Sequence, residues 1–405
     1  MSAVLVINSG SSSFKYQLID LDTERPLASG LVERIGERSG HTIHRGPDGT
    51  SERSLEIPDH TAGFQAMIDA FEADGPSLAE HPPVAVGHRV VHGGKRFFEP
   101  TIVTPLVEIN IEDLADLAPL HNPANLQGIR AAKKAFPDVP HVAVFDTAFH
   151  QTLPPEAYTY AIDAALAERH RVRRYGFHGT SHKYVSETAA EFLGRPLADL
   201  KQIVLHLGNG ASACAIDGGR SVDTSMGLTP LEGLVMGTRS GDLDPAVLIH
   251  LARRANLDID GLDELLNRKS GLLGLSGTGD MRDVRRAAND GDEAAQLALA
   301  TTVHRLKHYI GAYTALLGGL DVLTFTAGIG ENDAALRADA LAGLEGLGIV
   351  LDPERNASRS SEARVISADG SPVTVLVVPT DEELEIARQT VQAIGQSATG
   401  ASAAG

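Results

Sequence analysis

The sequence predicts a mixed α/β fold built from two related domains, and three observations support this prediction. A glycine-rich hairpin pattern occurs twice, once in the first residues of the chain and again near its middle. In each half, predicted strands come first and helices alternate with strands afterwards, which is typical of a mixed sheet covered by helices. The length of 405 residues also exceeds what a single hydrophobic core usually supports.

The two hairpin patterns share a strand, a turn of small residues and a return strand that ends in Ile-Asp. The first reads VLVINSGSSSFKYQLID over residues 4–20, and the second reads QIVLHLGNGASACAID over residues 202–217. Gly and Ser in the turns allow positive φ angles and close approach of the backbone. Such turns direct N–H groups outward and suit an anion such as phosphate. The repeat therefore predicts a duplicated nucleotide-handling fold.

The other elements follow from apolar runs and helical periodicity. In the first half we expect strands at residues 27–35, 42–45, 54–57, 85–88 and 141–145, and a helix at 60–72. In the second half we expect strands at 220–223, 322–326 and 373–378, and helices at 246–255, 292–317 and 381–394. Residues 396–405 consist almost entirely of Ala, Ser, Gly and Thr, a composition that predicts a disordered tail.

Composition narrows the possible partners and location. A net charge of −18 disfavours nucleic acid and anionic membranes, so any phosphate site must be locally positive. The single cysteine, Cys214, excludes an intrachain disulfide and is expected to be a buried apolar residue. Because the chain shows no signal peptide and no apolar run near ~20 residues, we expect a cytoplasmic protein without membrane partners.

Two standard phosphate motifs do not fit the chain. No G-x-x-x-x-G-K-[ST] pattern is present, which excludes a P-loop. The segment Gly328-Ile329-Gly330-Glu331-Asn332 follows a predicted strand, but Asp333 occupies the third glycine position of a dinucleotide fingerprint. An ordinary strand-to-helix turn and a phosphate-binding turn both remain open for this segment. The second hairpin favours the phosphate interpretation.

Four loops at predicted strand ends carry groups suited to phosphoryl transfer: Arg89, Asp146, His178 and Arg239. Each has a structural alternative, such as a surface ion pair for the arginines or a helix cap for Asp146. His178 and His182 have a spacing that zinc ligands use, although no third ligand is evident. The run HRVRR at residues 170–174 is expected to be a solvated face.

The last predicted helix begins with a cluster of acidic residues. Thr380 and Glu383 have the spacing of a capping box, which would assign Glu383 to the helix start. Glu382 is then a spare carboxylate at a helix N-terminus. It could interact with the helix dipole or reach a magnesium ion through water.

Taken together, these loops resemble the acetate kinase family of the sugar kinase, heat-shock chaperone and actin superfamily. The resemblance runs from Val4 to about Ala387. The motifs that carry it, in chain order, are NSGSSSFK (8–15), HRVVHGG (88–94), HNPANL (121–126), FDTAFH (145–150), GFHGTSH (176–182), HLGNG (206–210), MGTRSGDLDPA (236–246) and FTAGIGEN (325–332). One departure is Asp381, where the family commonly has Asn.

The resemblance implies an α/β fold of two duplicated ribonuclease-H-like domains, as in actin-like ATPases, with an active-site cleft between them. The expected N-terminal domain comprises residues 1–147 and 384–405, and the expected nucleotide-binding domain comprises residues 148–383. The implied partners are acetate and ATP or ADP as substrates and a second copy of the chain in a homodimer. The implied cofactor is Mg²⁺, with Mn²⁺ as a substitute, and the product is acetyl phosphate.

The resemblance also assigns site residues. The catalytic residues would be Asp146, His178 and Arg239. The substrate would contact Arg89, with Val91, Leu120, Phe177 and Pro230 around its methyl group. The nucleotide would contact Lys15, His206, Leu207, Gly208, Asn209, Gly210, Asp280, Met281, Arg282, Gly328, Ile329, Gly330, Glu331 and Asn332. The metal would be held by Asn8 and Glu382.

A carboxylate is ionised at neutral pH, so its phosphorylation needs positioning and charge neutralisation more than a strong base. We expect direct in-line transfer, with propionate or another short carboxylate as the alternative acceptor. A sugar kinase or a chaperone-type ATPase would use the same nucleotide fold. The small apolar pocket argues against the sugar kinase, and turnover of ATP without a carboxylate would favour the ATPase.

Overall fold

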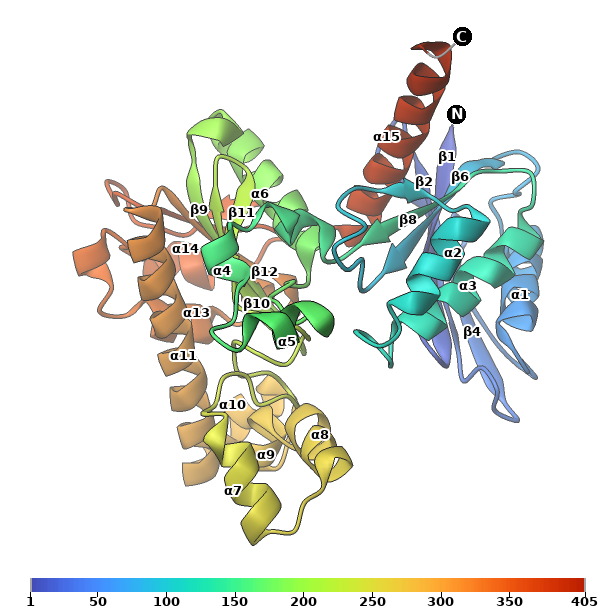
Figure 1. Cartoon of the computed structure of the whole chain (residues 1–405). Helices are drawn as coiled ribbons and strands as arrows, with labels where there is room; N and C mark the ends of the chain where they lie inside the picture. The colour runs from blue at the N-terminus through green and yellow to red at the C-terminus, as the bar shows by residue number, and fades with distance from the viewer. Residues whose placement is uncertain (1, 404–405) are drawn as a thin grey trace. The chain divides into compact units, whose positions relative to one another are not determined.

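The computed structural model describes residues 2–403, with side chains described for residues 2–397. The chain divides into two compact units (Figure 1). Unit 1 contains residues 1–148 and 381–405, and unit 2 contains residues 149–380. The expected domain boundaries lay between residues 147 and 148 and between residues 383 and 384. Each unit is built around one mixed sheet, which agrees with the predicted α/β class.

Unit 1 has an eight-stranded sheet with the order β5-β4-β3-β2-β1-β6-β8-β7. Its strands are β1 Ala3–Ser9, β2 Ser13–Asp20, β3 Arg25–Glu33, β4 Gly40–Gly46, β5 Gly49–Leu55, β6 Pro83–Val90, β7 Thr101–Ile102 and β8 His141–Phe145. Its helices are α1 His60–Asp74, α2 Pro105–Asp113, α3 Asn122–Ala135 and α15 Glu382–Ala403. The first hairpin is confirmed as the antiparallel pair β1 and β2.

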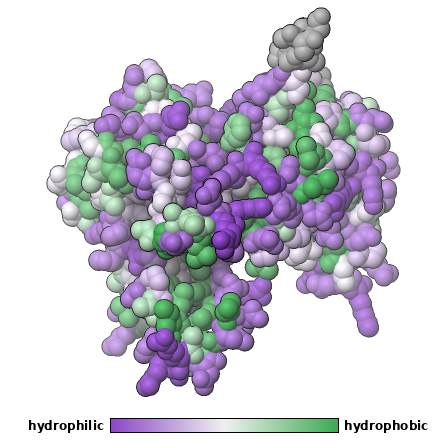
Figure 2. Space-filling view, in the orientation of Figure 1, coloured by the Kyte–Doolittle hydropathy of each residue, from purple (hydrophilic) through white to green (hydrophobic). Residues whose placement is uncertain are grey.

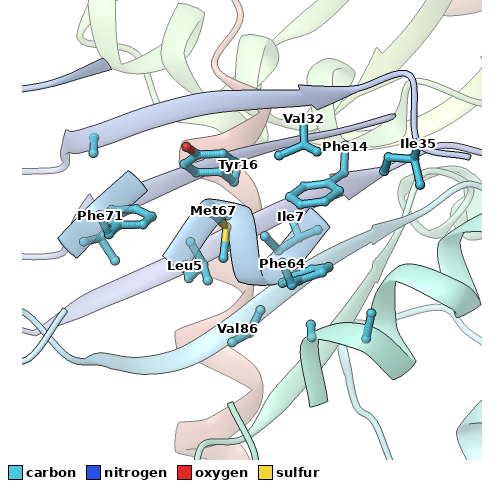
Figure 3. Close-up of a cluster of buried hydrophobic side chains, with 14 of the residues drawn as sticks. Leu5, Ile7, Phe14, Tyr16, Val32, Ile35, Phe64, Met67, Phe71 and Val86 are labelled. Carbon is cyan, nitrogen blue, oxygen red and sulfur yellow. The ribbon is translucent and has the colours of Figure 1, made fainter. Parts of the chain in front are cut away.

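The core of unit 1 lies between the sheet and helices α1 and α3 (Figure 3). Strand residues such as Leu5 and Val86 pack there with Phe64 of α1. The ring of Phe64 stacks on that of Phe14, with centroids 4.6 Å apart. Helix α15 also packs on β1, β6 and β8. A Cβ atom at Gly87 of β6 would lie 2.5 Å from Thr390 of α15, so only glycine allows this close packing.

Unit 2 has a six-stranded sheet with the order β11-β10-β9-β12-β14-β13. Its strands are β9 Lys201–Leu207, β10 Ala211–Asp217, β11 Arg220–Thr224, β12 Val322–Thr326, β13 Arg364–Val365 and β14 Thr374–Val377. Its helices are α4 Pro155–Tyr158, α5 Ala164–Arg169, α6 Gly179–Leu193, α7 Ala246–Arg254, α8 Ile259–Arg268, α9 Gly271–Ser276, α10 Met281–Asn289, α11 Glu293–Leu317, α12 Ala327–Asn332, α13 Ala334–Leu341 and α14 Pro353–Ala357. Short 3₁₀ turns occur at Ala148–Thr152, Leu197–Asp199 and Glu345–Leu347.

The second hairpin is confirmed as the antiparallel pair β9 and β10. Helices α6 and α11 pack against the sheet of unit 2. Cys214 is fully buried among apolar residues of β9, β10 and α6, as expected. Among the described residues, no helix is long and apolar enough to cross a membrane.

Two expectations for local structure are wrong. Helix α15 continues to Ala403, so the predicted tail is helical from residue 396 to 403, and residues 404–405 lie outside the described part. The 170–174 run is not a solvated face. The Arg173 guanidinium lies 3.6 Å from the ring centre of Tyr158, and Arg174 donates to Thr224 O and to Glu232.

Candidate active site

The first half of the candidate site lies at the edge of the unit 1 sheet where three parallel strands end. Strands β1, β6 and β8 are parallel neighbours, so their carboxyl ends meet at one edge. Arg89 near the end of β6 forms a two-pronged ion pair with Asp146, which follows β8. The Nε–Oδ1 and Nη2–Oδ2 distances are 3.0 and 2.6 Å. Arg89 Nη1 lies 3.4 Å from Oδ1 of Asn8 on β1, so topology joins three predicted residues.

Glu382, the first residue of α15, belongs to the same cluster. Its pKa is raised to about 7, chiefly by burial. Arg89 and Lys15 oppose the rise, whereas the carboxylates of Asp146 and Glu383 add to it. Burial disfavours the charge on Arg89, but Asp146 and Glu382 outweigh it and raise the pKa of Arg89. The cluster therefore has more carboxylates than its two cations balance.

The start of α15 differs from the predicted capping box. The Asp381 side chain accepts a hydrogen bond from Leu384 N at 2.9 Å and so caps the helix. Thr380 is held elsewhere, because its hydroxyl lies 2.9 Å from Ser181 Oγ. Asp381 therefore acts as a helix cap, and Glu382 follows it directly.

The oxygen donors of this cluster fit the implied Mg²⁺. Mg²⁺ usually takes only one or two carboxylates from a protein and completes its shell with water and substrate phosphates. Asn8 supplies an amide oxygen and Glu382 a carboxylate whose pKa is raised chiefly by burial. No group of three or more His, Cys, Asp or Glu side chains with metal-binding geometry occurs among the described residues. The site thus fits a metal that arrives with the nucleotide.

A small pocket of about 220 Å³ opens beside this cluster in unit 1. Its lining includes five predicted residues and five that we did not predict. The lining is Asn8, Ser9, Gly10, Ser13, Lys15, Arg89, Val91, Leu120, His121 and Asn125.

Two asparagines at the start of α3 hold the loop that follows β6 beside this pocket. Asn125 accepts from Val91 N at 3.0 Å and donates to Ser9 O at 2.6 Å. Asn122 accepts from His92 N at 3.1 Å and donates to His92 O at 2.9 Å. The HNPANL motif therefore fixes the backbone that carries Val91.

The second half of the candidate site gathers around Gly210 in unit 2. A Cβ atom at Gly210 would lie 3.5 Å from Arg239 Nη1 and also 3.5 Å from His178 Nε2. Three predicted motifs therefore meet at one point. Arg239 donates to Pro230 O at 3.0 Å, and it forms no ion pair within the part of the chain that is described. Burial alone lowers the pKa of Arg239, as expected of a partly buried cation without a counter-ion.

His178 directly precedes helix α6 as its N-cap residue and lies in the left-handed region, with φ at 56°. Such a conformation is uncommon for a residue with a side chain and often marks a functional position. Its Nδ1 lies 2.9 Å from Ser212 Oγ, and the ring stacks on that of His206 with centroids 4.2 Å apart. Ser212 Oγ also lies 2.7 Å from Nε2 of the buried His182. The histidines therefore share a serine instead of forming the open zinc site that their spacing allowed.

A cavity of about 740 Å³ in unit 2 lies beside two of the glycine-rich turns, and we call it the nucleotide cavity after the predicted residues that line it. Eight predicted nucleotide residues line it: Gly208, Asn209, Asp280, Met281, Arg282, Gly328, Ile329 and Asn332. Gly279, Arg285, Asp333 and Arg359 complete the lining and were not predicted. His206, Leu207, Gly210, Gly330 and Glu331 lie outside this lining. Lys15 belongs to unit 1.

The residues expected around the substrate methyl group divide between the units. Val91 and Leu120 line the pocket of unit 1. Phe177 and Pro230 belong to unit 2, where Phe177 O accepts from His150 Nε2 at 2.9 Å and Pro230 O accepts from Arg239. Each unit is described by itself, so the methyl pocket stays a prediction.

Comparison with known proteins agrees with this geometry. A family model described as the acetokinase family matches residues 3–388. The chain belongs to the acetokinase family. An acetate kinase of Leifsonia xyli is 78% identical over 394 residues, which cover 97% of this chain and 99% of that protein.

Two solved structures share the fold of this chain. The acetate kinase of Porphyromonas gingivalis matches with a TM-score of 0.93 and 44% identity, covering 97% of this chain and all of that chain. A propionate kinase of Francisella tularensis matches with a TM-score of 0.90 and 41% identity, over 97% and 100% of the two chains. These matches confirm the predicted two-domain α/β fold class.

Proposed function

We propose that the protein is an acetate kinase that transfers the γ-phosphoryl group of ATP to acetate, reversibly, giving acetyl phosphate and ADP. The observation that carries this proposal is the uncompensated Arg239 guanidinium, which lies with His178 against the Gly210 backbone. A partly buried cation without a counter-ion suits a phosphoryl group, whose three equatorial oxygens gain charge contacts in the transition state. The printed names of the relatives support acetate as the acceptor.

Hydrogen bonding supports a definite role for His178. Burial, with His150 and His206 nearby, holds the pKa of His182 well below its usual range, so His182 is neutral. Its Nδ1 is buried without a hydrogen-bond partner, so an N–H there would be an unpaired donor. The proton therefore belongs on Nε2, which donates to Ser212 Oγ.

The Ser212 hydroxyl links the proton position on His182 to that on His178. A hydroxyl that accepts from His182 can donate its own proton to Nδ1 of His178. The remaining N–H of His178 is then on Nε2, the atom that faces Gly210 and the Arg239 side. In this arrangement His178 donates a hydrogen bond from Nε2 to the transferring phosphoryl group. Ser212 and His182 are positioning residues.

Arg89 would orient the acceptor carboxylate. Its Nε and Nη2 hold Asp146, which fixes the guanidinium plane, while Nη1 points toward Asn8 and the small pocket. Val91 and Leu120 give that pocket apolar walls suited to a methyl group. No general base is required, because acetate is already ionised. Asp146 therefore positions Arg89 and does not remove a proton.

Asn8 and Glu382 would hold Mg²⁺, with Mn²⁺ as a substitute. When bound, the ion neutralises the phosphate oxygens of the nucleotide. Lys15 would add a second positive charge for those phosphates. In-line transfer requires that acetate and the γ-phosphoryl group meet, so we propose that both half-sites serve one reaction. Closure around that reaction would keep water from the acyl phosphate.

Trapping of the acyl phosphate with hydroxylamine tests the activity. The protein is incubated with MgATP and formate, acetate, propionate or butyrate, and the hydroxamate is measured. We expect the highest kcat/KM with acetate. Because one methylene changes discrimination by only ~1–3 kcal/mol, propionate is the second candidate, and the Francisella propionate kinase match favours it over the others. Absence of hydroxamate with all four acids, or sustained ATP turnover without any acid, would contradict the proposal.

A homodimer and a cytoplasmic location remain predictions. Helices α7 and α8 have no buried residues, and Ile249 and Ile259 are 54% and 84% exposed. Figure 2 shows apolar surface in the region of these helices. Exposed apolar patches commonly mark protein contacts. Light scattering after gel filtration measures the oligomeric state directly, and a monomer at micromolar concentration would contradict the dimer.

A further inference from the structure

A second cavity of unit 2 has not been assigned a ligand in the reaction proposed above. It has a volume of about 580 Å³ and lies next to the nucleotide cavity, with which it shares Asn332 and Arg359. We call it the arginine cavity. Its lining is Glu331, Asn332, Ala334, Arg337, Ala357, Ser358, Arg359, Ser360, Ser361 and Arg364. The wall contains three arginines in a chain whose net charge is −18.

The arginines of this cavity are bonded only to neutral groups. Arg337 is 1% exposed and donates to Asn356 Oδ1 at 2.8 Å and to Gly330 O at 2.8 Å. Arg364 donates to Ser360 O at 3.1 Å and to Glu331 O at 3.4 Å, while its buried Nε has no hydrogen-bond partner. Within the described part of the chain, no ion pair joins Arg337, Arg359 or Arg364 to a carboxylate.

The acidic groups nearby are engaged elsewhere or exposed. Glu331 faces Arg364, but its Oε1 accepts from Thr380 N at 3.3 Å. Asp333 pairs with Arg285 at 3.4 Å. Glu362, on the loop before β13, is exposed.

The pKa shifts of the arginines are consistent with this excess of positive charge in the arginine cavity. Burial lowers the pKa of Arg337 to about 10, and the neighbouring Arg364 lowers it further, with Asp333 opposing. Burial also lowers the pKa of Arg364, against the effect of Glu331. Like charges held together in a partly buried cavity are unfavourable unless an anion joins them. Guanidinium groups bind phosphate oxygens through paired N–H donors.

We propose that the arginine cavity binds an oxyanion of the phosphate class, at the same time as a nucleotide occupies the neighbouring cavity. Arg364 and Arg359 supply the positive charge that binds the oxyanion. The buried Arg337, held in place by its hydrogen bonds, adds a further positive charge to the cavity wall. Because Arg359 and Asn332 line both cavities, occupation of one changes the affinity of the other, and linkage makes this effect reciprocal. The site is a regulatory one that senses phosphate.

Calorimetric titration with inorganic phosphate tests the proposal. The full-length protein is first saturated with a non-hydrolysable ATP analogue, which fills the nucleotide cavity including its γ-phosphoryl position. We expect one phosphate to bind under these conditions. Arg364→Gln should weaken this binding at least tenfold, and the exposed Arg359→Gln should weaken it without a burden on folding. Arg355→Gln is the matched control, because Arg355 pairs with Asp369 outside the cavity and should leave phosphate binding unchanged.

Thermal unfolding gives a second readout. Phosphate should raise the Tm of the wild type above its value in sodium chloride of equal ionic strength, and Arg364→Gln should abolish this difference. The proposal is overturned if the saturated wild type binds no phosphate, or if Arg364→Gln and Arg359→Gln both bind it as the wild type does. Failure of the ATP analogue itself to bind would instead contradict the proposed kinase function.

Discussion

The two units share one strand order but present different chemistry at equivalent positions. The order β3-β2-β1-β6-β8-β7 in unit 1 matches β11-β10-β9-β12-β14-β13 in unit 2, strand for strand. In the hairpin of unit 1, Asn8 pairs with Lys15, and in that of unit 2, His206 pairs with Ser212. The first pair contributes an amide oxygen and a cation. The second contributes a histidine and the hydroxyl that holds His178. Topology therefore supplies the positions, and side chains decide which ligand each unit handles.

The largest effect is expected at Arg239 of unit 2. This arginine has no carboxylate partner among the described residues, whereas Arg89 of unit 1 pairs with Asp146. Arg239→Ala should lower kcat by ~10³ to 10⁵ while changing the KM for ATP only a few-fold, because the guanidinium acts mainly on the transition state. Steady-state kinetics measure both constants. Arg253→Ala, an exposed arginine of α7, should behave as the wild type. A near-normal kcat in Arg239→Ala would refute the role.

In unit 1 the corresponding test is Glu382→Gln. Activity should fall at least ~10²-fold, because the proposed metal ligand is lost. The folded pKa of about 7 lies above the ordinary value of 4.5, so the native state binds the proton more tightly and stability falls as the pH rises from 4.5 to 7. Glutamine cannot ionise. The metal-free variant should therefore be more stable than the wild type at pH 8 by about 2 kcal/mol, after allowance for partial exposure.

Urea unfolding at pH 8 and at pH 4.5 separates the two effects of Glu382→Gln, since the stability difference should nearly vanish at the lower pH. Glu354→Gln, in the first turn of α14, is the matched control for a carboxylate near a helix start. If Glu382→Gln were less stable than the wild type at pH 8, the charge on Glu382 would be compensated without a metal, contrary to our interpretation.

The hairpin turn of unit 2 can be tested with Gly210→Ala. The added methyl group has ordinary contact distances of 3.5 Å, so the fold should persist, but it would occupy the space between Arg239 and His178. A displacement of about 1 Å at the reacting group should lower kcat by ~10². Gly311→Ala in α11, where a Cβ atom meets nothing within 4 Å, should keep full activity and gain up to ~1 kcal/mol of stability. Unchanged kcat in Gly210→Ala would show that phosphate binds elsewhere.

A smaller effect is expected for Ser212→Ala, which removes the hydroxyl between His178 and His182. Loss of one positioning hydrogen bond should lower kcat about tenfold. Nitrogen-15 NMR of labelled histidines should show His178 with its proton on Nε2 in the wild type and a mixture of tautomers in the variant. Ser221→Ala removes the partner of His150 instead and should leave the His178 signal unchanged. An Nδ1–H tautomer in the wild type would contradict the proposed donor role.

The smallest effect should follow Asp381→Asn. Asparagine caps helices about as well as aspartate, so stability should change by less than ~0.5 kcal/mol and the metal requirement should not change. Asp381→Ala should cost about 1 kcal/mol in urea unfolding because Leu384 N loses its acceptor. A large rise in the Mg²⁺ concentration needed by Asp381→Asn would instead make Asp381 part of the metal site.

Local sequence predicted the hairpins and most strands, because period, turn residues and apolar runs are local properties. It missed α2 and α3, although Pro105 and Pro123 at their starts and Lys133 and Lys134 at the end of α3 are helix signals. Strand β5 was expected at 54–57 and lies at Gly49–Leu55, because its residues are mostly exposed and lack an apolar pattern.

Other errors could not be avoided from local sequence, because distant partners decide them. Thr380 and Asp381 are both good caps, and only the contact with Ser181 removes Thr380 from that role. Arg174 was expected to be solvated, but it is fixed by carbonyl groups of residues 224–226. Arg285 and Arg359 belong to no motif, and only folding brings them to the nucleotide cavity.

The return of α15 to unit 1 has a consequence for biosynthesis. Ile386 and Thr390 are fully buried against the sheet, close to Gly87, yet they follow the whole of unit 2 in the chain and are synthesised after it. Protein synthesis adds ~5–20 residues per second. Helix α15 is therefore made on the order of ten to fifty seconds after the sheet, because residues 149–380 are made in between. During that interval its apolar face needs protection, as by a chaperone. A premature stop before residue 381 would leave a nascent chain unable to complete its first-made half.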